Sequence, residues 1–101
     1  MDSKQLMSHL KGKGFPNKIL KAFAKVPREN FVPKNLKHLA YADTALPLEH
    51  GATISQPYTI AFMLNLLELK KGQKILEIGS GCGYLLALLA EIIKGEIYGI
   101  E

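Results

Sequence analysis

The sequence predicts an α/β fold in which short N-terminal helices lead into a single βαβ unit. Two observations carry this prediction. Apolar residues recur at helical spacing in the N-terminal half, and residues 74–101 read as a strand, a helix and a strand around three glycines at alternate positions. The length of 101 residues suits one domain, and 48% hydrophobic residues are enough to form a core.

Two short helices are expected first. Asp2 or Ser3 can cap the first helix, and Gly12 ends it. Pro16 suits the start of the second helix, and Pro27 stops it. The apolar positions expected to face the core are Leu6, Met7 and Leu10 in the first helix and Ile19, Leu20, Phe23 and Val26 in the second.

The segment 28–56 has no clear hydrophobic period. An irregular stretch of this length is uncommon in a compact domain and is often functional. Helical periodicity returns after Pro57, where Ser55 or Gln56 stands at the capping position. The residues expected on the buried face of this third helix are Ile60, Ala61, Met63, Leu64 and Leu67.

The predicted βαβ unit occupies residues 74–101. Lys74–Ile78 is short, apolar and bounded by glycine, which is typical of a buried strand, and residues 96–101 form the second strand. Between them, Tyr84–Ile93 is apolar nearly all round, which predicts a buried helix. The two strands should therefore be parallel and joined by a right-handed crossover.

A glycine loop follows the first of these strands. Gly79, Gly81 and Gly83 allow a tight turn and let a ligand approach bare main chain, and the helix start beyond them favours negative charge. The loop indicates a nucleotide-like ligand without specifying it; a turn that binds nothing is the alternative. The dinucleotide fingerprint needs its third glycine one residue later, where Tyr84 stands. The phosphate loop of NTPases needs a lysine that is absent here.

Two acidic residues accompany this loop. Glu77 precedes it and would repel a diphosphate, but it suits a ligand that carries cationic or hydroxyl groups. Glu101 closes the second strand, where a carboxylate can accept hydrogen bonds from both hydroxyls of a ribose. An ordinary exposed glutamate is the other interpretation of Glu101.

These motifs resemble those of a known family. Residues 77–83 (Glu-Ile-Gly-Ser-Gly-Cys-Gly) and 97–101 (Ile-Tyr-Gly-Ile-Glu) are similar to the first two motifs of S-adenosylmethionine-dependent methyltransferases with a Rossmann-like sheet. Residues 26–33, 41–43 and 53–58 (Thr-Ile-Ser-Gln-Pro-Tyr) resemble segments of the protein-L-isoaspartate O-methyltransferases. The matching segments follow the same order along the chain.

The resemblance implies roles for individual residues. Ser55 would be the catalytic residue, beside the methyl donor and the incoming carboxylate, and Thr53 and Ile54 would line the substrate pocket. A helix cap alone is the other interpretation of Ser55. The implied cofactor is S-adenosyl-L-methionine. The residues implied to bind it are Gln56, Glu77, Gly79, Ser80, Gly81, Gly83 and Glu101.

The implied reaction is methyl transfer to the α-carboxylate of an isoaspartyl residue in a protein or peptide. The ester then collapses to a succinimide that reopens partly to normal aspartate, so that the family repairs aged proteins. A carboxylate is already nucleophilic, so proximity and orientation carry most of the catalysis. Ser55 would act as a positioning hydroxyl, since no His and Asp surround it in the pattern of an activated nucleophile.

The resemblance also divides the chain. Residues 1–56 would form the N-terminal helical and loop region with the active-site segment, and 57–101 would begin the cofactor-binding domain, truncated after its second strand. We expect the chain alone to be inactive and to form a homodimer or larger oligomer, because open strand edges and the apolar helix Tyr84–Ile93 lack partners. The alternative is a non-catalytic half-domain that binds S-adenosylmethionine or oligomerises.

Composition argues against several other classes. The 13 Lys plus Arg and 9 Asp plus Glu leave a net charge of +4, and the basic residues are scattered, so we expect no nucleic-acid partner. No apolar run approaches the length of a membrane span, so no membrane partner is expected. A single cysteine fits a reducing compartment such as the cytoplasm. The three histidines are not spaced like metal ligands, so no metal site is expected. That cysteine, Cys82, is expected to be a small buried filler.

Overall fold

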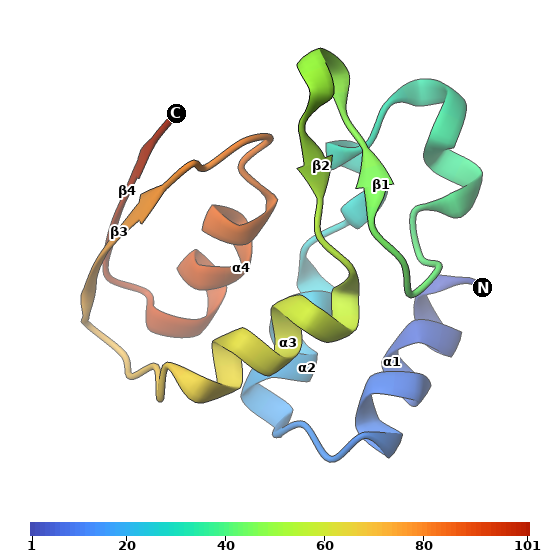
Figure 1. The fold of residues 1–101 in the computed structure, drawn as a ribbon. Helices are drawn as coiled ribbons and strands as arrows, with labels where there is room; N and C mark the ends of the chain where they lie inside the picture. The colour runs from blue at the N-terminus through green and yellow to red at the C-terminus, as the bar shows by residue number, and fades with distance from the viewer.

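The computed structural model describes residues 1–101 and begins with the two predicted helices, α1 (Ser3–Gly12) and α2 (Asn17–Lys25). Asp2 caps α1: its Oδ1 accepts a hydrogen bond of 2.8 Å from the backbone N–H of Gln5. The Gln5 side chain accepts one of 2.8 Å from the backbone N–H of Asp2, which completes a capping box. Helix α2 contacts α1, α3 and α4 and is the central helix of the molecule (Figure 1).

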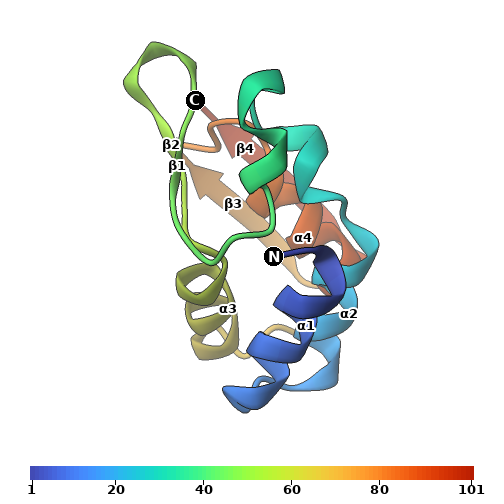
Figure 2. The same ribbon diagram turned by 90° about the vertical axis from the view of Figure 1, so that its right-hand side faces the viewer.

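The irregular segment contains elements that no sequence pattern indicated. They are three 3₁₀ turns and one antiparallel hairpin: η1 (Arg28–Phe31), η2 (Lys34–Leu39), β1 (Leu46–Pro47), η3 (Glu49–Gly51) and β2 (Thr53–Ile54). Leu46 pairs with Ile54, and both are buried. Strands of two residues are too short to show an alternating pattern. In Figures 1 and 2 the hairpin stands beside the loop that precedes α4.

Helix α3 (Pro57–Leu66) follows the hairpin directly. The structure confirms a buried face that includes Ile60, Ala61 and Leu64. The predicted burial of Met63 and Leu67 is wrong, because their exposed fractions are 60% and 58%. The helix is apolar on most sides, so its period does not single out one buried face. Nothing in the chain packs on the side that carries Met63.

The βαβ unit consists of β3 (Lys74–Ile78), α4 (Tyr84–Ile93) and β4 (Glu96–Ile100). The strands are parallel, as predicted, with Ile75 opposite Ile97. Figure 1 shows α4 between this two-stranded sheet and the rest of the chain. The prediction of a buried first strand is wrong, since Ile78 is 82% exposed. Helix α4 covers one face of the sheet, and no part of the chain covers the other.

One cluster of 20 buried apolar residues, from Leu6 to Ile93, forms the core. It draws on all four α-helices and on the hairpin, and it includes residues on both sides of the predicted boundary at residue 56. That boundary stays a prediction. The only buried charged side chain is that of Arg28. None of the helices has the length and apolar character needed to cross a bilayer.

Candidate active site

The glycine loop joins β3 to α4, and its shape explains its composition. Gly79, Gly81 and Gly83 have φ angles of +79°, +55° and +85°, a region that side-chain-bearing residues rarely adopt. The backbone N–H groups of Gly79 and Ser80 donate hydrogen bonds of 2.6 and 3.2 Å to the carbonyl of Ile100 at the end of β4. The loop is therefore fixed at the carboxyl edge of the parallel strands, where α/β folds bind their ligands.

A small cavity of about 110 Å³ lies between this loop and the end of the hairpin. Seven of the ten residues predicted for the site line it: Thr53, Ile54, Ser55, Glu77, Gly79, Ser80 and Gly81. The other lining residues are Ile60, Cys82, Tyr84 and Leu85. The structure thus places the predicted catalytic segment directly opposite the predicted cofactor loop, although the two are separated by α3 and β3 in the sequence.

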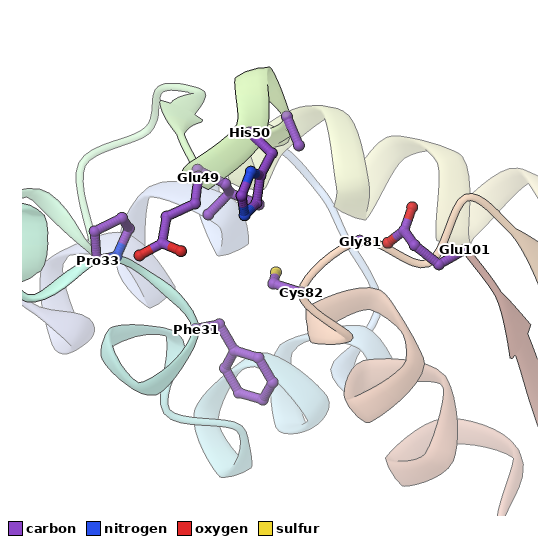
Figure 3. A pocket seen from close by; sticks show the side chains of 9 residues that line it. Phe31, Pro33, Glu49, His50, Gly81, Cys82 and Glu101 are labelled. Atoms are coloured by element: carbon purple, nitrogen blue, oxygen red, sulfur yellow. The ribbon is translucent and has the colours of Figure 1, made fainter.

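A second, larger cavity of about 530 Å³ adjoins the first, since Gly81 and Cys82 line both. Figure 3 shows it between the hairpin turn, which carries Glu49 and His50, and the end of β4, where Glu101 lies. Its remaining lining residues are Phe31, Pro33, Leu48 and Ala52. Of the predicted cofactor residues, Glu101 therefore faces the larger cavity, whereas Gln56 and Gly83 line neither.

Two carboxylates mark the ends of the neighbouring strands. The Oε1 atom of Glu77 is buried and has no hydrogen-bond partner. Burial raises the pKa of Glu77 above its ordinary value, and the negative charge of Glu101 raises it further. A buried acceptor without a partner is unfavourable unless a ligand supplies a donor. Glu77 and Glu101 together would accept hydrogen bonds from a ligand that carries ammonium and hydroxyl groups.

Ser55 is exposed, and its hydroxyl makes no hydrogen bond within the protein. The structure confirms that Gln56 stands at the predicted capping position of α3, but its side chain makes no capping hydrogen bond. Asp43 Oδ1 instead accepts a hydrogen bond of 2.8 Å from the backbone N–H of Tyr58. Asp43, which lies in the loop before the hairpin, therefore provides the side-chain cap of α3, and the Ser55 hydroxyl remains available to a ligand.

Sequence reasoning missed several residues at the site. Cys82 is exposed and lines both cavities, so its prediction as a buried filler is wrong. Asp43 and Arg28 hold the Ser55 segment through hydrogen bonds across more than ten residues of sequence, which no local pattern could reveal. Nowhere do three or more His, Cys, Asp or Glu side chains converge where a metal ion could bind.

Comparison with known proteins identifies relatives of the whole chain. The sequence model of the family described as protein-L-isoaspartate(D-aspartate) O-methyltransferase matches residues 1–101. A protein-L-isoaspartate O-methyltransferase of Ignicoccus hospitalis is 43% identical over 102 residues, covering 97% of this chain and 48% of the relative. One of Flavobacterium psychrophilum is 48% identical over 98 residues, covering 96% and 46%.

Solved structures agree with these relatives. A protein-L-isoaspartate O-methyltransferase structure superposes with a TM-score of 0.89 at 34% identity, covering 99% of this chain and 34% of that one. A second, from Plasmodium falciparum, has a TM-score of 0.86 at 28% identity and covers 100% and 49%. It is described as a protein-L-isoaspartate O-methyltransferase in complex with S-adenosyl-L-homocysteine.

The chain spans less than half the length of these relatives. The family match spans residues 1–101, so it includes the hairpin, the glycine loop and both strand ends that form the two cavities. The predicted resemblance is therefore confirmed, and the chain belongs to the protein-L-isoaspartate(D-aspartate) O-methyltransferase family.

Proposed function

We propose that this chain supplies the methyl-donor loop and the active-site segment of a protein-L-isoaspartate O-methyltransferase. The substrate is the α-carboxylate of an isoaspartyl residue in a protein or peptide. The observation that carries the proposal is the small cavity, where Thr53, Ile54 and Ser55 face Glu77 and the glycine loop. The relatives' greater length supports the further proposal that these residues work within a longer protein.

The residues around the cavities fit S-adenosylmethionine. We assign Glu77 to its methionine part, because the unpaired Glu77 oxygen would accept a hydrogen bond from the ammonium group. The loop residues Gly79, Ser80, Gly81 and Gly83 are assigned to the same part of the cofactor. Glu101, in the larger cavity, would accept hydrogen bonds from the ribose hydroxyls. Gln56 borders the same segment, and its side chain already donates a hydrogen bond of 3.2 Å to the carbonyl of Asp43. Gln56 would thus hold the Ser55 segment in place through this hydrogen bond.

Ser55 would orient the substrate. When bound, S-adenosylmethionine supplies an electrophilic methyl group on a sulfonium sulfur. The Ser55 hydroxyl would donate a hydrogen bond to one oxygen of the isoaspartyl carboxylate and hold the other toward the glycine loop, which is catalysis by positioning. No general base is needed for a carboxylate nucleophile. The nearby His9–Asp43 pair, 2.9 Å apart, makes no hydrogen bond with Ser55.

Binding of S-adenosyl-L-homocysteine tests the cofactor assignment. It is measured by calorimetry on the full-length protein, that is, the longer protein in which these residues are proposed to work. A β-branched side chain at Gly81, where φ is +55°, strains the loop and fills the space next to bare main chain. Gly81→Val should abolish binding. Gly14→Val is the matched control, since Gly14 has φ of +90° but lies between α1 and α2, far from both cavities. Unchanged affinity in Gly81→Val, with circular dichroism intact, would refute the assignment.

We also propose that the 101-residue chain by itself forms a homodimer or larger oligomer through the uncovered face of its sheet. Large apolar side chains on that face are exposed: Leu76, Ile78, Tyr98 and Ile100. This observation favours the second candidate, an oligomerising half-domain without catalytic activity. Light scattering should give a mass above 11.2 kDa. A monomer would refute oligomerisation, and methylation of an isoaspartyl peptide by this chain alone would refute its inactivity.

The single cysteine supports a cytoplasmic location.

A further inference from the structure

Arg28 is the most unusual residue of the fold. It begins η1, its exposed fraction is 0%, and it makes no ion pair. Its Nη2 donates a hydrogen bond of 2.9 Å to the backbone carbonyl of Ser55 and a longer one of 3.5 Å to that of Thr44. Its Cζ lies 5.0 Å from the centroid of the Tyr84 ring, in a cation–π arrangement.

These contacts join the two walls of the small cavity. Ser55 belongs to one wall, and Tyr84, the first residue of α4, directly follows the glycine loop that forms the other. Tyr84 packs against Phe23 and Phe31, whose ring centroids lie 6.4 and 5.3 Å from the centroid of its own ring. The guanidinium therefore connects the Ser55 backbone to a part of the fold that is packed firmly into the core.

The cost of placing Arg28 there is evident. Its Nε and Nη1 atoms are buried without partners, and burial lowers the pKa of the guanidinium from its ordinary value. Burial also raises the pKa of Tyr84 to about 12, so the ring is neutral and does not pair with the charge as a phenolate. The neighbouring carboxylate of Glu29 accepts a hydrogen bond from Tyr41 instead. An apolar side chain of similar volume would fill this place at less electrostatic cost.

We propose that Arg28 is a positioning residue for methyl transfer: it holds the Ser55 backbone against the glycine loop, so that the Ser55 hydroxyl stays directed at the substrate carboxylate. This inference rests on the proposed function of Ser55. Arg28 touches neither substrate nor cofactor, because its guanidinium is closed to solvent. A shift of about 1 Å in a positioning group can cost about 100-fold in rate, which sets the scale of the effect.

The test compares variants of the full-length protein, assayed for methyl transfer from S-adenosylmethionine to an isoaspartyl peptide. Arg28→Met should lower kcat by about 100-fold, with little change in the Kd of S-adenosyl-L-homocysteine and with Tm unchanged or raised. Arg28→Lys keeps one donor but not the planar fork, and should recover part of the lost kcat. A residue with a merely structural role would lose Tm and kcat together.

Val32→Ala is the matched control, because Val32 is a buried residue just beyond η1 that contacts neither cavity. It should lower Tm and leave kcat unchanged at temperatures where the protein stays folded. A double-mutant cycle with Ser55→Ala tests whether Arg28 acts through Ser55. The double variant Arg28→Met/Ser55→Ala should be no slower than Ser55→Ala alone, since the hydroxyl that Arg28 positions is already gone.

Three results would overturn the inference. The first is an unchanged kcat in Arg28→Met, and the second is a double variant whose loss equals the product of the two single losses. The third applies where Arg28→Met does not fold: a Tm and kcat that fall together in Arg28→Lys. If the wild-type protein is active and one of these three results is obtained, the inference about Arg28 is refuted and the proposed function still stands. A wild-type protein that methylates no isoaspartyl peptide refutes the proposed function and this inference with it.

Discussion

Replacing Glu77 with glutamine should make the unliganded protein more stable and its ligand binding weaker. The buried Oε1 of Glu77 has no partner, and both burial and the charge of Glu101 raise its pKa. The folded protein therefore binds this proton more tightly than the unfolded chain does. Consequently the stability of the folded state falls as pH rises from the unfolded pKa through the raised folded pKa, and the penalty is complete above that value. Glu77→Gln removes the charge and should flatten this pH dependence.

The magnitude follows from the same contact. Glutamine keeps the Oε1 acceptor and removes only its charge. An unpartnered buried group costs about 1–3 kcal/mol and more when it is charged, and because Glu77 is partly exposed and screened by water we take a gain of about 1 kcal/mol from removing the charge. In a chain of this size that corresponds to a rise in Tm of about 4–8 °C at pH 7. In the complex, loss of a charge-assisted hydrogen bond of about 1.5–3 kcal/mol should weaken S-adenosyl-L-homocysteine binding by about 10- to 100-fold.

Thermal unfolding of the chain followed by circular dichroism, and calorimetry of the full-length protein with S-adenosyl-L-homocysteine, give the two readouts. Glu96→Gln is the matched control: Glu96 lies at the opposite end of the same sheet, exposed, with Lys74 3.8 Å away. Its Tm and affinity should change little. A lower Tm in Glu77→Gln at pH 7, or an unchanged affinity, would show that the orphaned carboxylate is not held for a cationic ligand.

Three further predictions concern catalysis, packing and association. Ser55→Ala should lower kcat for an isoaspartyl peptide by at least about 100-fold, because removing the hydroxyl costs no less than misplacing it, and should leave S-adenosyl-L-homocysteine affinity nearly unchanged; equal losses in both would assign Ser55 to the cofactor. Gly95→Ala should destabilise the chain by about 1–3 kcal/mol in chemical denaturation, because a Cβ there would lie 2.2 Å from the carbonyl oxygen of Gln73; wild-type stability would contradict that packing. Ile78→Lys, on the uncovered face of the sheet where Ile78 is 82% exposed, should shift the chain toward monomer in light scattering, and an unchanged mass would place the interface elsewhere.

Much of this protein can be predicted from local patterns in its sequence. Asp2 capping α1, the proline between helices, and the strand–helix–strand order around alternating glycines all depend on neighbouring residues, so their signals survive without tertiary information. The glycine loop is the clearest case. Three glycines with positive φ are a requirement of the turn itself, so the motif could be recognised and located before any contact was known.

Tertiary structure alone decided which faces are covered and which distant groups meet. Met63 and Ile78 have the same apolar character as core residues, and they are exposed because no other element of the chain packs against them. Asp43 caps α3 from 15 residues away, and Arg28 reaches the carbonyl of Ser55 across 27 residues, so neither contact leaves a periodic trace in the sequence. Burial and long-range hydrogen bonding are properties of the assembled fold, since they depend on what surrounds a residue as well as on its identity.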